Sequence, residues 1–206
     1  MSKTIGFIGC GNMGKAMIGG ILNAKLVTPE SIIVADLNEE SLSEISLIYD
    51  IKTTTDNNEV AKTSDIIVLS IKPNLYQVVI KQIKDQVKKD VIIVTIAAGK
   101  GIKGTEEMFG RKLKVVRVMP NTPALVGEGM AAICPNAVVT KEELVQIVNI
   151  FESFGKSEIV DEKLMDVVTS VSGSSPAFVY IFIEAMADAA VLDGMPRNKA
   201  YKFAAQ

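Results

Sequence analysis

The chain has 206 residues, 48% of them hydrophobic, and a formal net charge of −2. This length is long for one domain and short for two full ones, and the apolar share is ample for a packed core. The near-neutral charge leaves no electrostatic footprint for nucleic acid, and no apolar run is long enough for a bilayer, so we expect neither partner.

The absence of histidine and the small number of cysteines further limit the catalytic and metal-binding chemistry that the chain can perform. The chain contains no histidine, which excludes the histidine acid/base of many dehydrogenases and histidine-ligated zinc, so we expect no metal. Cys10 and Cys134 make no disulfide framework, and Cys10 is interpreted as a small filler of its loop. Because the N-terminus passes directly into a strand without a secretory signal, we expect a cytoplasmic protein.

The first predicted elements are a strand at residues 4–8, a glycine-rich turn, and a helix over residues 15–22. Gly9 would allow the tight turn, Gly11 the approach of a pyrophosphate, and Gly14 close packing of the helix on the sheet. Glycine-rich turns also serve ordinary strand–helix corners. However, a second predicted strand, residues 31–35, ends in Asp36, where a ribose-binding acid is expected, and this favours dinucleotide binding.

Strands and helices alternate up to about residue 160. Runs rich in valine and isoleucine predict strands buried on both faces of a parallel sheet. The expected strands are residues 49–54, 65–71, 91–96, 114–119, 129–134 and 157–160, and the expected helices are residues 39–48, 57–62, 75–83, 105–109 and 140–154. We therefore predict an α/β fold whose first domain, residues 1–160, is a doubly wound, mostly parallel Rossmann sheet.

Only helices are predicted after residue 161. Residues 172–175 resemble a helix cap, and the helix expected over residues 176–192 is apolar on nearly every side. Such a helix must be buried all round, and it is too interrupted and too short for a membrane span. We therefore expect residues 161–206 to begin an all-α domain, incomplete here, that is covered by a second chain or by a further C-terminal part.

Four strand ends carry small or polar groups suited to a ligand: residues 9–14, 70–73, 97–99 and 119–123. Lys72 is equally well interpreted as a solvated charge or as a contact to ribose or phosphate oxygen. Asn121 could donate to a carboxamide or a substrate, or form an Asx turn before Pro123. Asp36, with no arginine following nearby, favours NAD over NADP, although Asn38 could tolerate either.

The segment from Ser172 to Pro176 is a second candidate anion site. Its amide and hydroxyl groups are expected at a helix N-terminus, which suits a carboxylate. The alternative is a plain N-cap, but five small or turn-forming residues exceed what capping requires.

Together these segments resemble one family, pyrroline-5-carboxylate reductase, along the whole chain. The markers are Ile5–Gly14, Lys72-Pro73, Ala97–Gly99, Arg117–Pro123, Ser172–Phe178 and Asp193–Arg197. The resemblance implies reduction of 1-pyrroline-5-carboxylate to L-proline by NADPH or NADH, and a helical C-terminal domain that interlocks into a homodimer or a larger homo-oligomer.

The resemblance also implies a set of site residues. Together with Gly14 and Asn121, the expected cofactor contacts are Ile8, Gly9, Cys10, Gly11, Asn12, Met13, Asp36, Asn38, Asn57, Ser70, Ile71, Lys72, Pro73, Ala97, Ala98 and Gly99. The expected substrate contacts are Glu162, Ser172, Gly173, Ser174, Ser175 and Pro176. Two departures stand out: the family has glycine where Ser175 stands, and it continues past residue 206 with helices and a substrate loop.

An iminium already carries the proton that a ketone would need, so we hypothesise that no side chain here is an essential general acid. Two alternatives remain. A β-hydroxyacid dehydrogenase of the hydroxyisobutyrate type shares the glycine loop but needs a lysine on the long helix, and residues 176–192 contain none. A non-catalytic nucleotide-binding protein would keep the cofactor fold without turnover.

Overall fold

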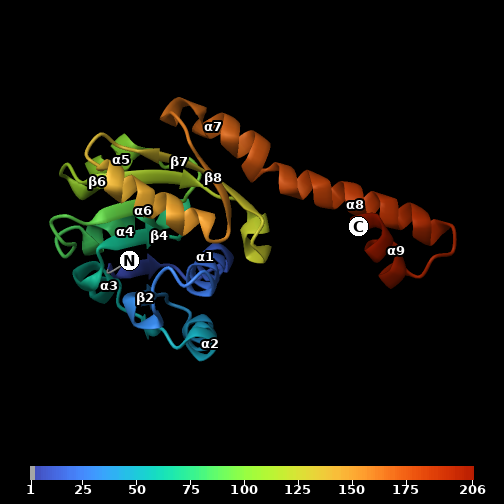
Figure 1. Cartoon of the computed structure of the whole chain (residues 1–206), viewed down its shortest axis with the longest axis horizontal. Coiled ribbons are helices and arrows are strands. Elements are labelled where there is room, and N and C mark those ends of the chain that lie inside the picture. Colours follow the sequence, from blue (N-terminus) through green and yellow to red (C-terminus); the bar gives the residue numbers. More distant parts are fainter. Residues whose placement is uncertain (1–2) are drawn as a thin grey trace.

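A computed structural model describes residues 3–206, and these residues form an eight-stranded sheet followed by a helical arm (Figure 1). The strand order is β3-β2-β1-β4-β5-β6-β7-β8. The first six strands are parallel to one another, while β7 is antiparallel to β6 and β8 is parallel to β7. The predicted doubly wound, mostly parallel sheet is therefore confirmed.

The strands lie close to their predicted positions. Their bounds are β1 Ile5–Ile8, β2 Ile32–Ala35, β3 Lys52–Thr54, β4 Ile66–Leu69, β5 Ile92–Thr95, β6 Lys114–Met119, β7 Gly129–Pro135 and β8 Gly155–Ile159. All residues of β1, β2, β4 and β5 are buried, as continuous apolar runs predict for central parallel strands.

Helices cover both faces of the sheet, and each face has its own apolar core. Helices α1 (Asn12–Asn23), α2 (Glu39–Tyr49) and α6 (Lys141–Glu152) pack on one face. Helices α3 (Asn57–Thr63), α4 (Tyr76–Ile83) and α5 (Ile102–Phe109) pack on the other. A capping box begins α6, since the Thr140 hydroxyl accepts from the Glu143 amide and the Glu143 carboxylate accepts from the Thr140 amide.

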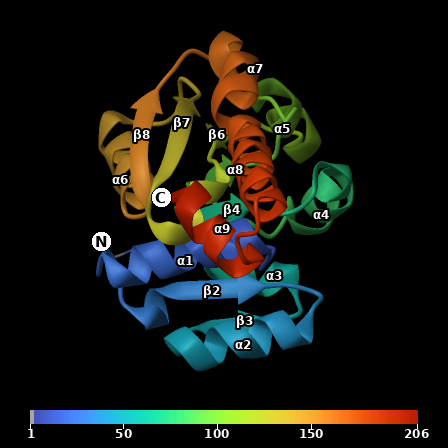
Figure 2. The same ribbon diagram turned by 90° about the vertical axis from the view of Figure 1, so that its right-hand side faces the viewer.

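Beyond β8 the chain is helical to its last described turn, and it leaves the sheet as an extended arm (Figures 1 and 2). The arm contains the 3-10 turn η4 (Glu162–Leu164), α7 (Met165–Val168), the π-helical turn η5 (Thr169–Gly173), α8 (Ser175–Leu192) and α9 (Arg197–Ala205). The division into domains at residue 160 stays a prediction.

The expectation that residues 172–175 cap a new helix is wrong. No side chain caps α8; instead, the amide and the hydroxyl of Ser174 both donate to the carbonyl of Thr169. The helix therefore runs from Glu162 to Leu192 through a π turn without a fresh N-terminus. The cause is that serine hydroxyls can bond back to the preceding turn, which keeps the chain helical.

Helix α8 is exposed to solvent instead of buried in this chain. Phe178, Ile181 and Phe182 are each more than 60% exposed, and Ala187 is the buried residue of the helix. The continuous helix of 31 residues is long and apolar enough to cross a membrane by length and composition alone, so the expectation that it is too short was wrong. That no membrane is a partner stays a prediction.

Candidate active site

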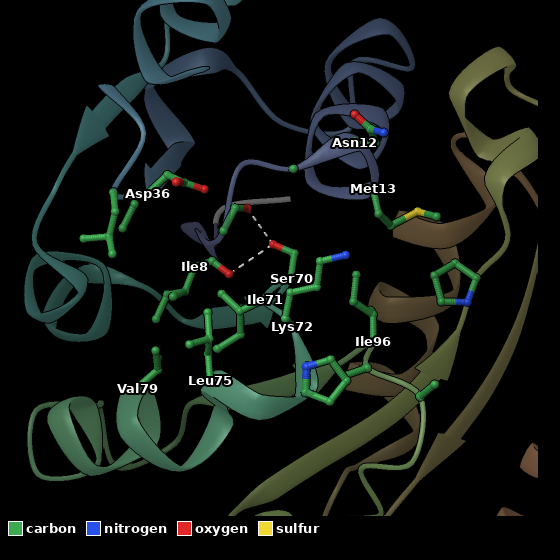
Figure 3. A pocket seen from close by; sticks show the side chains of 18 of the residues that line it. Ile8, Asn12, Met13, Asp36, Ser70, Ile71, Lys72, Leu75, Val79 and Ile96 are labelled. Carbon is green, nitrogen blue, oxygen red and sulfur yellow. Dashed lines mark hydrogen bonds between the residues drawn. The ribbon is translucent and has the colours of Figure 1, made fainter. Parts of the chain in front are cut away.

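A cavity of about 660 Å³ opens at the carboxyl ends of the parallel strands, where the strand order reverses between β1 and β4 (Figure 3). Ligands of doubly wound sheets bind at this position. The lining residues are Ile8, Gly9, Gly11, Asn12, Met13, Ala35, Asp36, Leu37, Asn57, Ser70, Ile71, Lys72, Pro73, Leu75, Val79, Ile96, Ala97, Ala98, Met119, Pro120, Thr122 and Leu125.

Gly9 and Gly14 of the first loop have the spatial roles that the motif predicts, whereas the role of Gly11 stays a prediction. Gly9 has φ +105°, and a Cβ there would lie 2.4 Å from the Ser70 carbonyl oxygen. A Cβ on Gly14 would lie 2.7 Å from the Gly9 oxygen, so helix α1 can approach the loop only with glycine there. A Cβ on Gly11 would meet nothing within 4 Å.

The amino end of α1 faces the cavity in a form suited to phosphate. Gly11 is its N-cap residue, and no side chain caps the helix. The first amides of a helix have no partner within the helix, and the helix dipole favours an anion beside them. Gly11, Asn12 and Met13 all line the cavity. This end of the pocket can therefore hold a diphosphate.

The Ser70 side chain holds the glycine loop in place. Its hydroxyl donates to the carbonyl of Gly9 at 2.6 Å and lies 3.1 Å from that of Ile8 (Figure 3). The side chain thus ties the end of β4 to the glycine loop, and because Ser70 also lines the cavity, its expected cofactor contact stays a prediction. Nearby, the buried Tyr76 hydroxyl donates to Leu69 at 2.9 Å and meets Thr95 at 2.8 Å, which joins β4 to β5. Sequence reasoning missed this pair.

Asp36 lies at the end of β2 with its carboxylate in the loop. One oxygen accepts from the Cys10 amide at 2.5 Å, and the other accepts from the Asn38 amide at 2.9 Å. Each carboxylate oxygen can accept a further hydrogen bond, so Asp36 can still receive a ribose diol. The Asn38 side chain caps α2 by accepting from the Ser41 amide, and it does not line the cavity.

Cys10 is buried and does not line the cavity. Burial raises the pKa of its thiol to about 11, with Lys15 lowering it and Asp36 and Glu44 raising it to smaller extents. The thiol is therefore protonated near neutral pH, as expected of a small filler. Lys72, by contrast, is exposed at the edge of the cavity, where its ammonium can reach a ligand.

The wall at the end of β6 joins the cavity to the helical arm. Met119, Pro120 and Thr122 line the cavity, but Asn121 does not. The Asn121 amide nitrogen donates to the carbonyl and hydroxyl oxygens of Ser172, both at 3.2 Å, and its oxygen accepts from the Met130 amide at 2.8 Å. The Asx turn considered for Asn121 is wrong, because Pro123 has no amide to donate.

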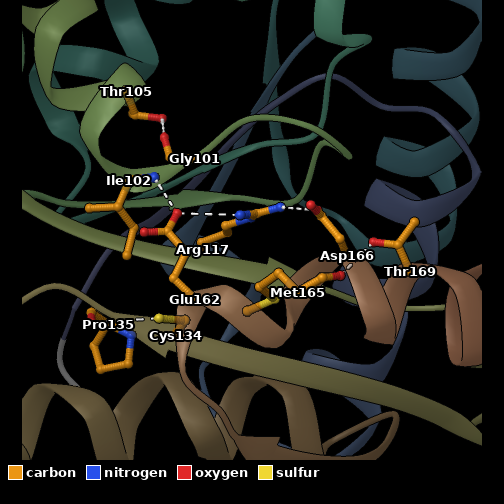
Figure 4. A network of polar contacts seen from close by, with 10 residues as sticks. All are labelled: Gly101, Ile102, Thr105, Arg117, Cys134, Pro135, Glu162, Met165, Asp166 and Thr169. Carbon is orange, nitrogen blue, oxygen red and sulfur yellow. Dashed lines mark hydrogen bonds and ion pairs between the residues drawn. The ribbon is translucent and has the colours of Figure 1, made fainter.

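Glu162 lies at the base of the arm in a network with β6 and α5 (Figure 4). Its Oε1 accepts from the Ile102 amide at 2.8 Å and from Arg117 at 3.3 Å. Arg117 also reaches Asp166 at 3.5 Å, and its side chain is only 12% exposed. Sequence reasoning missed Arg117 as a structural cation; the signal was a charge within an otherwise apolar strand.

The structure therefore brings most predicted cofactor residues to one cavity and leaves some outside its lining. Those outside are Cys10, Gly14, Asn38, Gly99 and Asn121, together with the predicted substrate set Glu162, Ser172, Gly173, Ser174, Ser175 and Pro176. Gly173 lies beside the cavity wall, because a Cβ there would be 2.6 Å from the Met119 methyl carbon. The roles assigned to all of these residues stay predictions.

The sheet order and the pocket define a Rossmann-type dinucleotide-binding protein, and the comparisons with known proteins agree. Residues 4–99 match the family model "NADP oxidoreductase coenzyme F420-dependent", and residues 162–206 match "Pyrroline-5-carboxylate reductase dimerisation". The chain is 46% identical over 206 residues to the pyrroline-5-carboxylate reductase of Escherichia coli strain K12, covering 100% of this chain and 77% of that protein.

Two further relatives extend the likeness. The pyrroline-5-carboxylate reductase of Methanosarcina acetivorans is 40% identical over 205 residues, covering 100% of this chain and 76% of the relative. A crystal structure of Plasmodium falciparum pyrroline carboxylate reductase with NADP bound superposes with a TM-score of 0.90 at 35% identity, covering 100% of this chain and 75% of that one. The chain belongs to the pyrroline-5-carboxylate reductase family.

Proposed function

We propose that this protein reduces 1-pyrroline-5-carboxylate to L-proline by hydride transfer from NADH or NADPH, the last step of proline synthesis. The observation that carries the proposal is the 46% identity to the Escherichia coli reductase, which extends over all 206 residues. The cavity supports it, because it combines an uncapped helix end with a carboxylate at the end of β2. These are the two features that recognise the diphosphate and the ribose of a nicotinamide dinucleotide.

Different parts of the cavity would bind different parts of the nicotinamide dinucleotide. The loop from Gly9 to Met13 would hold the diphosphate, Asp36 the ribose diol, and the apolar wall of Ile96, Ala97 and Met119 would face the nicotinamide ring. The bound cofactor supplies the hydride. The chain contributes position, since a flat apolar wall orients a ring and excludes water from it.

The proposed reaction requires little acid catalysis by the protein. Hydride adds to C5 of the protonated imine, the electron pair of the C=N bond moves to nitrogen, and the ring becomes the secondary amine of proline. Because the iminium already carries its proton, no side chain must deliver one. This matches a chain without histidine. Complete loss of hydride transfer in a Lys72 or Glu162 variant that still bound both ligands would contradict it.

We further propose that NADH is preferred to NADPH. If Asp36 binds the ribose diol, a 2′-phosphate would approach its carboxylate, and the first turn of α2 beside it carries Glu39 and Glu40. Lys15, which lies close enough to lower the pKa of the neighbouring Cys10 thiol, is paired with Glu44. Carboxylates repel a phosphate and accept hydrogen bonds from a ribose diol. The carboxylates of Asp36 and of the first turn of α2 therefore favour NADH, which has no 2′-phosphate.

We propose that α8 and α9 of two copies pack together in a homodimer or a larger homo-oligomer. The support is the match of residues 162–206 to a dimerisation family and the exposure of Phe178, Ile181 and Phe182 on α8. An apolar helix left in water is unfavourable, and a second copy would cover it. Light scattering should therefore give at least twice the monomer mass, and Phe182→Glu should lower it. A monomeric wild type would refute the homo-oligomer.

The test of function is oxidation of NADH and NADPH upon addition of 1-pyrroline-5-carboxylate, with proline identified as the product. It should be run on these 206 residues and on the natural polypeptide with whatever sequence accompanies them in the gene. Oxidation of hydroxyisobutyrate with reduction of NAD would instead support the hydroxyacid dehydrogenase. Cofactor binding without turnover in the natural polypeptide would support the hypothesis of a non-catalytic nucleotide-binding protein. A cytoplasmic location and the absence of a nucleic-acid partner stay predictions.

A further inference from the structure

The π turn in the arm has a backbone defect that the sequence explains. In a continuous helix, the carbonyl of Ser172 would accept a hydrogen bond from the amide of residue 176. Residue 176 is proline, which has no amide hydrogen, so this carbonyl lacks its helical donor. The turn before it is already widened, since the Ser174 amide bonds the Thr169 carbonyl five residues back.

Asn121 supplies the missing donor. Its amide nitrogen lies 3.2 Å from the Ser172 carbonyl oxygen and 3.2 Å from the Ser172 hydroxyl. Its own oxygen is held by the Met130 amide at 2.8 Å, which fixes the side chain from the β7 side. The side chain of a residue that follows β6 therefore completes the hydrogen bonding of a turn 51 residues away in sequence.

A second contact joins the same turn to the cavity. Gly173 packs so closely on Met119 that a Cβ would lie 2.6 Å from the methionine methyl carbon. Met119 is itself part of the cavity wall. The π turn is thus fixed against this wall by a hydrogen bond at Ser172 and by a packing contact at Gly173.

We propose that Asn121 is a positioning residue that holds the π turn, and with it residues 172–176, at a fixed distance from the Met119 wall of the cavity. The inference rests on the proposed function and on the predicted role of residues 172–176 as substrate contacts: the turn would then face the imine, and the Met119 wall the nicotinamide ring. Asn121 then sets the separation of the two reactants without touching either. The arm makes such a device necessary, because α8 packs chiefly on α9 and projects away from the sheet (Figure 1).

The first test is Asn121→Asp. The substitution keeps an oxygen for the Met130 amide but places a second oxygen, instead of a donor, beside the Ser172 carbonyl. We expect kcat/KM for 1-pyrroline-5-carboxylate to fall by about 10- to 100-fold, the cost of misplaced reactants. The dissociation constants of NADH and NADPH should not change, because Asn121 does not line the cavity.

Asn136→Asp is the matched control. Asn136 makes a similar link: its amide nitrogen donates to the Leu113 carbonyl at 2.8 Å and to the Glu106 carboxylate at 2.9 Å, and its oxygen accepts from the Val115 amide at 3.3 Å. It does not line the cavity. Its substitution should lower the melting temperature and leave kcat/KM unchanged. A loss of kcat/KM in both variants would show that Asn121 contributes only to stability, and would overturn the proposal.

Hydrogen exchange tests the link without any turnover. In Asn121→Asp the amides of Ser174 and Ala177 should exchange faster, and in Asn136→Asp they should not. If the wild type does not reduce the imine, the proposed function fails, whereas faster exchange would still support the link. Unchanged exchange, or wild-type kcat/KM, would refute the inference. If Asn121→Asp does not fold, Asn121→Ser replaces it. The serine side chain is too short to donate to the Ser172 carbonyl and adds no charge, and the same outcomes would support or refute the inference.

Discussion

Glu162 provides the sharpest test of how the arm is attached to the sheet. Its carboxylate Oε1 accepts from the Ile102 amide, at the start of α5, and from Arg117, whose side chain is 12% exposed. Glu162→Ala removes both contacts, while Glu162→Gln keeps an oxygen for the Ile102 amide and removes the charge. The two variants therefore separate the capping contribution from the ion pair.

The expected magnitudes follow from these contacts. Loss of the helix cap costs about 1 kcal/mol. Loss of the partner of a mostly buried arginine costs about 1–2 kcal/mol, after a discount because the Glu162 side chain is 38% exposed and Asp166 remains nearby. We expect Glu162→Ala to lower the free energy of unfolding by about 2–3 kcal/mol and Glu162→Gln by about 1–2 kcal/mol.

Urea unfolding at fixed protein concentration measures both variants, because an oligomer's stability depends on its concentration. The control is Asp166→Asn, whose side chain is 93% exposed and should change stability by less than about 0.5 kcal/mol. If Glu162→Ala unfolds within about 0.5 kcal/mol of the wild type, the network does not hold the arm. Equal losses in the Ala and Gln variants would show that the cap contributes nothing.

Three further predictions follow from the loop and the sheet. Gly14→Ala should destabilise the fold by about 1–3 kcal/mol in thermal unfolding, because its Cβ would lie 2.7 Å from the Gly9 oxygen; a wild-type melting temperature would argue against this packing. Asp36→Asn should raise the ratio of kcat/KM for NADPH to that for NADH by about tenfold, since it removes a repelling charge; an unchanged ratio would show that Asp36 does not select the cofactor. Burial works to raise the pKa of Glu143, but Lys114 at 2.6 Å and the Thr140 amide outweigh it and lower the pKa below 4.5. A lowered folded-state pKa gives stability that is present above the unfolded-state pKa and is lost as pH falls through the folded-state pKa. Glu143→Gln should therefore flatten the loss of stability below about pH 4.5, and a parallel acid profile would refute the assignment.

Much of the fold was predictable, because its signals are local. Runs of valine and isoleucine marked the central strands, and Gly9 and Gly14 marked a corner where a side chain would collide with backbone. The end of each parallel strand then placed the candidate ligand residues at one edge of the sheet. The positions of Asp36 and of the loop in the cavity follow from that topology.

The features that escaped prediction depend on contacts distant in sequence. Helix α5 begins at Ile102, earlier than the expected residue 105, because the Glu162 carboxylate accepts its first amide from 60 residues away. The π turn and the role of Asn121 depend likewise on Ser172 and Met130, which no local pattern connects to it. The serine-rich segment looked like a cap because serine is common in caps, and only the fold shows Ser174 bonding back to Thr169.

The measurement that bears most directly on the central claim is the rate of NADH and NADPH oxidation by the natural polypeptide when 1-pyrroline-5-carboxylate is supplied. We predict turnover with both cofactors, a higher kcat/KM with NADH, and formation of one proline for each nicotinamide oxidised. Binding of both cofactors without oxidation, in a folded and oligomeric preparation, would contradict it.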